Sequence, residues 1–92
     1  MPALTPEEAK SRLSAIPGWQ IEAGELVRTF QFKDFVQALG FVNRVGEAAE
    51  SAGHHPDIDI RYNKVRLALV THDAGGLTAK DFDLAAKAGG LA

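Results

Sequence analysis

The stretch ESAGHHPDIDIRYNKVRLALVTHDAGGLTAKD, residues 50–81, decides how this chain folds. It contains all three histidines of the sequence, and apolar and polar residues alternate on either side of Asn63-Lys64. Alternation with a period of two predicts half-buried strands, and the polar pair between them predicts a turn. We therefore expect a β-hairpin that returns His72 to the neighbourhood of His54 and His55.

The apolar residues of this hairpin predict its register. With Asn63-Lys64 as a two-residue loop, each apolar side chain on one strand faces an apolar partner on the other. The expected pairs are Tyr62 with Val65, Ile60 with Leu67, and Ile58 with Leu69. If the pairing continues past the ends of the strands, this register places His55 opposite His72. A register slipped by one residue would place His54 opposite His72 instead. Both alternatives bring two imidazoles together at the open end of the hairpin.

The composition predicts one small globular domain that covers residues 1–92, since 46% of the residues are hydrophobic and 24% are charged. A chain of this length buries only about 60–65% of its unfolded surface, so its core is thin. We therefore expect a homo-oligomer, with a dimer as the first expectation and a tetramer as the alternative. The net charge of −2 gives no electrostatic reason to expect nucleic acid or an anionic membrane as a direct partner.

The residue types that are missing also restrict the function. The sequence has no cysteine, which excludes disulfides, thiolate metal sites and thiol nucleophiles. No apolar run approaches the roughly 20 residues that a membrane-spanning helix needs, and the first residues do not resemble a signal peptide. We therefore expect a soluble, cytoplasmic protein.

The first third of the chain predicts a helix and a hairpin. The run from Thr5 to Glu8 is typical of a helix start with a capping box, and Pro17-Gly18 ends that helix. The turn Ala23-Gly24 then predicts a hairpin in which Ile21 pairs with Leu26.

A long helix is predicted from about Lys33-Asp34 to Gly53, which is the expected left-handed cap. The apolar stripe of this helix consists of Phe35, Leu39, Val42, Val45, Ala49 and Ala52. We interpret Gly40 and Gly46, which lie inside the helix, as positions where the backbone packs closely against a neighbour.

A last helix is predicted to begin after Thr78, with Asp81 as the partner in a capping box, and to run until Gly89-Gly90. The order of elements is then α-β-β-α-β-β-α. We expect an α+β domain of two layers, in which three helices pack on one face of a four-stranded, mostly antiparallel sheet made of two hairpins.

The histidines are candidates for acid–base catalysis. Unperturbed imidazole has a pKa of about 6.5, so near neutral pH one ring can donate a proton while its neighbour accepts one. His54, His55 and His72 are the candidate catalytic residues, with Glu50 and Asp81 as supporting carboxylates. Asp81 is also fully explained by the capping box, and Glu50 is equally compatible with an ordinary solvated residue near a helix end.

The spacing of these residues is more specific than their types. Glu50-x3-His54-His55-Pro56 is followed by Tyr62, His72 and Asp81 after gaps of five, nine and eight residues. Further runs of the same pattern are Phe32-Lys33-Asp34-Phe35, Gly40-Phe41, Tyr62-Asn63-Lys64-Val65, Thr71-His72 and Ala74-Gly75-Gly76-Leu77-Thr78. From Thr5 to about Ala86, the chain resembles the pterin-4a-carbinolamine dehydratase family.

This resemblance implies a lyase. Enzymes of the family dehydrate 4a-hydroxytetrahydrobiopterin, which aromatic amino-acid hydroxylases release, to quinonoid dihydropterin, so that the pterin can be reduced and used again. The pterin is the substrate, and neither a metal nor a further cofactor is expected. Paired imidazoles suit this reaction, because hydroxide leaves C4a poorly unless it is protonated, while a ring nitrogen sheds its own proton.

The resemblance also implies roles for individual residues. His54 and His72 form the principal acid–base pair, and His55 chiefly holds the pterin. The remaining substrate contacts are Gly53, Thr71, Asp73 and Trp19. The predicted register favours His55, rather than His54, as the residue that faces His72.

Two other functions fit parts of the pattern. Three histidines and a carboxylate suit zinc in a metal-dependent hydrolase, although adjacent residues such as His54 and His55 point in opposite directions when the chain is extended. A non-catalytic binding module is the other alternative, because relatives of the family serve as a dimerisation cofactor of a homeodomain transcription factor or as assembly factors. Trp19 and Tyr62 also have a structural explanation, in core packing.

Overall fold

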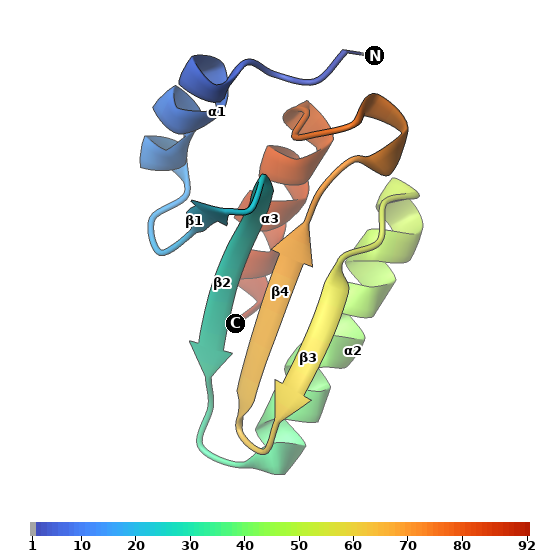
Figure 1. The fold of residues 1–92 in the computed structure, drawn as a ribbon. Helices are drawn as coiled ribbons and strands as arrows, with labels where there is room; N and C mark the ends of the chain where they lie inside the picture. Colours follow the sequence, from blue (N-terminus) through green and yellow to red (C-terminus); the bar gives the residue numbers. More distant parts are fainter. Residues whose placement is uncertain (1) are drawn as a thin grey trace.

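The strands form a single sheet in the order β1-β2-β4-β3, and all neighbouring strands are antiparallel (Figure 1). The computed structural model of the protein describes residues 2–92. Its strands are β1 (Gln20–Glu22), β2 (Glu25–Gln31), β3 (Asp57–Arg61) and β4 (Lys64–Leu69). Its α-helices are α1 (Pro6–Arg12), α2 (Phe35–Ala52) and α3 (Ala79–Leu91). The predicted α+β fold and its element order are therefore confirmed.

The start of α1 is fixed by the predicted capping box. The Glu8 N–H donates to the Thr5 hydroxyl at 3.1 Å, and the Thr5 N–H donates to the Glu8 carboxylate at 2.9 Å. This bond from the Thr5 backbone holds the pKa of Glu8 below its ordinary value. The carboxylate therefore stabilises the helix at neutral pH, and this contribution is lost as the pH falls through the pKa of Glu8.

The first hairpin has the predicted register, with Ile21 opposite Leu26. Its loop residues Ala23 and Gly24 have φ angles of 51° and 78°, which a tight two-residue loop between twisted strands requires.

The predicted register of the second hairpin is wrong by two residues. In the structure Ile60 lies opposite Val65, and Ile58 lies opposite Leu67. A shift of two residues keeps every side chain on its own face of the sheet, so both registers set apolar residues against apolar residues. The face pattern alone therefore does not distinguish them.

The loop of this hairpin is Tyr62-Asn63, because Asn63 is tied to the end of β2. The side-chain amide of Asn63 donates to the backbone carbonyl of Phe32 at 2.8 Å. The backbone carbonyl of Asn63 accepts the N–H of Phe32, also at 2.8 Å. Tyr62 takes the first loop position with a φ of 54°. Its side chain is 66% exposed, so the core packing expected for Tyr62 is wrong.

Helix α2 begins and ends as predicted, but its buried face is rotated. Asp34 caps it by accepting the Gln37 N–H at 2.9 Å, and Gly53 ends it with a φ of 63°. The buried residues are Ala38, Phe41, Val45, Ala48 and Ala49. Phe35 and Leu39 of the predicted stripe are exposed.

Aromatic packing explains the rotation of α2. The ring of Phe41 is fully buried, and its centroid lies 4.6 Å from that of Phe30 and 4.9 Å from that of Phe32. This contact turns the face that bears Phe41 toward the sheet.

The helix glycines do not have the roles that were predicted for them. Apart from its own helix backbone and its chain neighbours, a Cβ at Gly46 would meet no atom of residues 2–92 within 4 Å, and one at Gly40 would meet the side chain of Arg44. The prediction of close backbone packing at these positions is therefore wrong within one copy of the chain.

Helix α3 continues past the predicted end at Gly89-Gly90 to Leu91, whose carbonyl accepts from Arg44 Nε at 3.0 Å. In the part of the chain that the structure describes, no helix combines the length and the apolar character needed to cross a membrane.

Candidate active site

The three histidines meet at the end of the molecule where α2 ends and α3 begins. They line one hollow of about 250 Å³. Its other lining residues are Gly53, Val70, Thr71, Asp73 and Lys80. Two separate parts of the chain thus supply imidazoles to one cavity, which is the arrangement that acid–base catalysis on a bound molecule requires.

The histidines do not reach this hollow as partners on facing strands, so both predicted pairings are wrong. Strand β3 begins only at Asp57, and His54 and His55 therefore lie in the connection that follows α2. Strand β4 ends at Leu69, and His72 opens the 3-10 turn η2 (His72–Ala74). A bridge between Thr71 and Gly76 closes this turn, and so His72 approaches from a short loop.

His54 is held by the buried carboxylate of Asp81. The distance between His54 Nε2 and Asp81 Oδ1 is 2.5 Å, and the side chains are 12% and 0% exposed. The other carboxylate oxygen, Oδ2, accepts from the Thr71 hydroxyl at 2.8 Å and from the Thr78 N–H at 2.9 Å. Asp81 therefore closes the predicted capping box of α3 and also orients the imidazole of His54.

His55 is paired with the other predicted carboxylate. His55 Nε2 lies 2.6 Å from Glu50 Oε2, and Glu50 belongs to the last turn of α2. The two side chains are 64% and 79% exposed, so water weakens this contact. The contact orients the ring of His55 more than it stabilises the fold.

His72 is the histidine with the most freedom. Within residues 2–92, His54 and His55 each use only Nε2 in side-chain hydrogen bonds. The ring of His72 takes part in no side-chain hydrogen bond within the same residues. The Nδ1 atoms of His54 and His55 and both ring nitrogens of His72 thus remain available to a ligand. The hollow can therefore present both proton donors and proton acceptors to a ligand.

Two residues that line the hollow were missed by the sequence analysis, namely Val70 and Lys80. Lys80 precedes Asp81 in the first turn of α3, so its position next to a candidate residue was a usable signal. Its ammonium brings a positive charge to the edge of the histidine hollow. Val70 follows β4 and supplies apolar contact beside Thr71.

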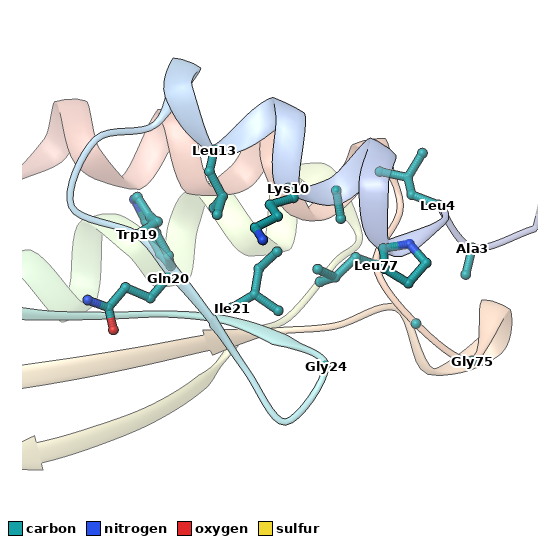
Figure 2. A pocket seen from close by; sticks show the side chains of 13 residues that line it. Ala3, Leu4, Lys10, Leu13, Trp19, Gln20, Ile21, Gly24, Gly75 and Leu77 are labelled. Atoms are coloured by element: carbon teal, nitrogen blue, oxygen red, sulfur yellow. The ribbon is translucent and has the colours of Figure 1, made fainter.

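Trp19 is the predicted site residue that the structure places elsewhere. Its side chain is 5% exposed and meets the ring of Phe30 edge-on, with centroids 6.0 Å apart. It lines a larger hollow of about 520 Å³ between α1 and β1, into which the side chain of Lys10 points (Figure 2). The histidines do not line that hollow, so within one copy core packing explains Trp19.

Two of the histidines are each paired with a different carboxylate. His54 is bound to Asp81, and His55 is bound to Glu50. Within residues 2–92, no three histidine or acidic side chains come together in a group that could hold a metal ion. The geometry gives the zinc hydrolase alternative no ligand set in the described residues.

The fold and the hollow define a small two-layer α+β protein whose histidines can exchange protons with a bound molecule. Comparison with protein families identifies the class further. The family described as Pterin 4 alpha carbinolamine dehydratase matches residues 2–91 of the chain. The chain therefore belongs to this family.

Individual relatives agree with this assignment. The chain is 65% identical over 86 residues to a protein of Acidobacterium capsulatum that is provisionally named a pterin-4-alpha-carbinolamine dehydratase, and the match covers 94% of both chains. A protein of Nostoc sp. with the same provisional name is 58% identical over 83 residues, which cover 90% of this chain and 89% of the relative.

Two solved structures have the same fold. The crystal structure of a transcriptional coactivator/pterin dehydratase from Brucella melitensis superposes with a TM-score of 0.94 at 37% identity and covers 98% of both chains. A pterin dehydratase-like protein described as a RuBisCO assembly factor in the alpha-carboxysome has a TM-score of 0.65 at 23% identity and covers 79% of this chain and 84% of its own. The second likeness concerns the fold alone.

Proposed function

We propose that this protein is a hydro-lyase that converts 4a-hydroxytetrahydrobiopterin to quinonoid dihydropterin and thereby helps to recycle the cofactor of aromatic amino-acid hydroxylases. The observation that carries the proposal is the gathering of three imidazoles around one hollow, two of them held by carboxylates at 2.5 and 2.6 Å. Membership of the pterin dehydratase family supports the same chemistry.

In the proposed reaction, an imidazolium protonates the hydroxyl group on C4a, and the C–O bond breaks to release water. A ring nitrogen of the pterin supplies the electron pair and gives its proton to a neutral imidazole. One proton is donated and one is accepted, so exchange with solvent restores both rings. No electrons leave the pterin, and the reaction therefore needs no further cofactor.

We assign the acid–base pair to His54 and His72. The bond to Asp81 fixes the orientation of the His54 ring, while the exposed residue His72 lines the same hollow. His55 chiefly holds the pterin, with Thr71, Asp73 and the backbone at Gly53 as further contacts.

The proposal is tested by following the decay of 4a-hydroxytetrahydrobiopterin in a stopped-flow spectrometer with and without the protein. We expect catalytic amounts of the protein to accelerate the decay, because general acid–base catalysis is typically worth about 10²–10⁴-fold. The alternative is a non-catalytic binding role of the same fold. Of the two solved neighbours, one is named a transcriptional coactivator/pterin dehydratase and the other a RuBisCO assembly factor. An unchanged decay rate would support that alternative.

A separate surface suggests what the protein binds besides its substrate. Large apolar side chains are exposed at the start of α2 and in the loop after β3, and they are Phe35, Val36, Leu39 and Tyr62. The loop and the helix start lie at the same end of the molecule, because Asn63 binds Phe32. We refer to these four side chains as the apolar end. Next to it, β3 is an edge strand that bears the exposed Ile58.

We propose that a second copy of the chain covers the apolar end. A soluble monomer rarely exposes contiguous apolar patches larger than roughly a few hundred Å², and an uncovered edge strand invites pairing with another chain. A homodimer is the simplest assembly, and a tetramer would follow if the helix and the edge strand served separate contacts.

The Val36→Glu variant tests the homo-oligomer. Val36 is 76% exposed, so the substitution leaves the core intact and places a charge in the proposed contact. We expect wild-type protein to be at least dimeric in analytical ultracentrifugation and Val36→Glu to shift toward the monomer. Ala86→Glu, at an exposed position of α3, is the matched control and should keep the wild-type mass. A monomeric wild type, or equal masses for all three proteins, would refute the contact.

A further inference from the structure

A groove leads away from the histidine hollow along the line where α2 and α3 pack. It consists of two hollows of about 370 and 340 Å³. The first shares His54 and Lys80 with the histidine hollow, and the two groove hollows share Ala48, Ser51 and Lys87. Because neighbouring hollows share lining residues, the three hollows follow one another along the two helices as a path that starts beside the histidine site. We call this path the helix groove.

The helix groove carries more positive than negative charge, although the chain as a whole has a net charge of −2. Its cations are Lys80, Lys87 and Arg44, and its acidic residues are Asp83 and Glu47. None of these five side chains belongs to an ion pair within residues 2–92. The cations of the groove are therefore free to meet an anionic ligand.

The positions of the cations set the length of such a ligand. Lys80 stands at the edge of the histidine hollow, and Lys87 lies seven residues further along α3, which corresponds to about 10 Å along the helix axis. Arg44 lies beyond Lys87 in the outer hollow, where its Nε donates to the carbonyl of Leu91 at 3.0 Å. The three-carbon side chain of biopterin is too short to reach Lys87 from a ring that lies among the histidines.

We propose that the site also accepts tetrahydropterins whose C6 substituent is long and anionic. The pterin ring occupies the histidine hollow, and the negative groups of the substituent lie in the helix groove against Lys87 and Arg44. This inference rests on the proposed function, because it places the pterin ring among the histidines. Carboxylates and phosphates share the chemistry that the groove recognises, and the experiment separates them.

The experiment compares the binding of stable 7,8-dihydropterins by isothermal titration calorimetry. The probes are 7,8-dihydrobiopterin with a short neutral substituent, 7,8-dihydrofolate triglutamate with carboxylates, and 7,8-dihydroneopterin triphosphate with phosphates. We expect at least one anionic probe to bind about tenfold more tightly than dihydrobiopterin at low salt, with an advantage that shrinks as salt is added. The preferred probe identifies the anion.

Variants locate the effect. Lys87→Gln should lower the affinity for the anionic probe by about threefold, and Lys87→Gln combined with Arg44→Gln should lower it by about tenfold. The affinity of both variants for dihydrobiopterin should stay within about twofold of the wild type. Lys64→Gln, an exposed lysine on β4 outside the groove, changes the net charge equally and should have no effect on either probe. Circular dichroism verifies that each variant is folded.

The outcomes separate this inference from the proposed function. If dihydrobiopterin binds and is dehydrated in its 4a-hydroxy form, but neither anionic probe binds more tightly, the groove proposal is wrong and the dehydratase proposal stands. An equal loss in Lys87→Gln and Lys64→Gln would also overturn it, since the effect would then come from net charge. If no pterin binds at all, both proposals fail.

Discussion

Replacing either His54 or His72 by alanine is expected to lower the kcat for dehydration of 4a-hydroxytetrahydrobiopterin by about 10²–10⁴-fold, the usual contribution of a positioned acid or base. Both rings line the same hollow, and each variant removes one of the two proton transfers. The measurement is stopped-flow decay at saturating substrate, with binding of 7,8-dihydrobiopterin determined separately.

His55→Ala is the matched comparison for these two variants, because it removes an imidazole from the same hollow. We expect it chiefly to raise KM and to weaken dihydrobiopterin binding, with a smaller loss of kcat. If His55→Ala abolished turnover while pterin binding held, the acid–base pair would have to include His55 in place of His54 or His72.

Replacing Asp81 by asparagine is expected to have the second largest effect, on stability and on turnover together. Oδ2 accepts the Thr71 hydroxyl and the Thr78 N–H, so the single oxygen of asparagine would occupy that place. The amide nitrogen would then face Nε2 of His54, where a carboxylate oxygen now lies. Two donors in contact force the imidazole into the opposite tautomer or out of position.

Loss of one buried hydrogen bond should lower the free energy of unfolding by about 1–3 kcal/mol, and displacement of the ring should lower kcat by about 10²-fold. Chemical denaturation and stopped-flow kinetics measure the two effects. Asp83→Asn, an exposed position on the same helix, serves as the control and should change neither quantity. A variant with reduced stability but wild-type kcat would show that Asp81 acts only as the helix cap.

Local signals in the sequence predicted most of the fold. Each capping box involves residues three positions apart, so Thr5 with Glu8 and Thr78 with Asp81 could be identified without any tertiary information. The alternating segments likewise predicted both hairpins. The register of the second hairpin could not be obtained, because a shift of two residues preserves the face pattern and the deciding bond joins Asn63 to Phe32 across the sheet.

The sequence predicted most residues of the candidate site but not how they are arranged. His54 and Asp81 are 27 residues apart, and only packing of α3 against α2 brings them within 2.5 Å. Family resemblance supplied Trp19 as a ligand contact, whereas its buried position reflects contact with Phe30 in the core. Lys80 was missed because only its position next to Asp81, and not its residue type, marked it as a member of the site.

The central claim is that the imidazoles of this one hollow, rather than the fold in general, perform the dehydration. Its most direct test is the stopped-flow decay of 4a-hydroxytetrahydrobiopterin with the triple variant His54→Ala, His55→Ala, His72→Ala, after circular dichroism has verified that it is folded. We expect acceleration by the wild type and a return to the uncatalysed rate with the triple variant. Acceleration that survives the loss of all three rings would contradict it.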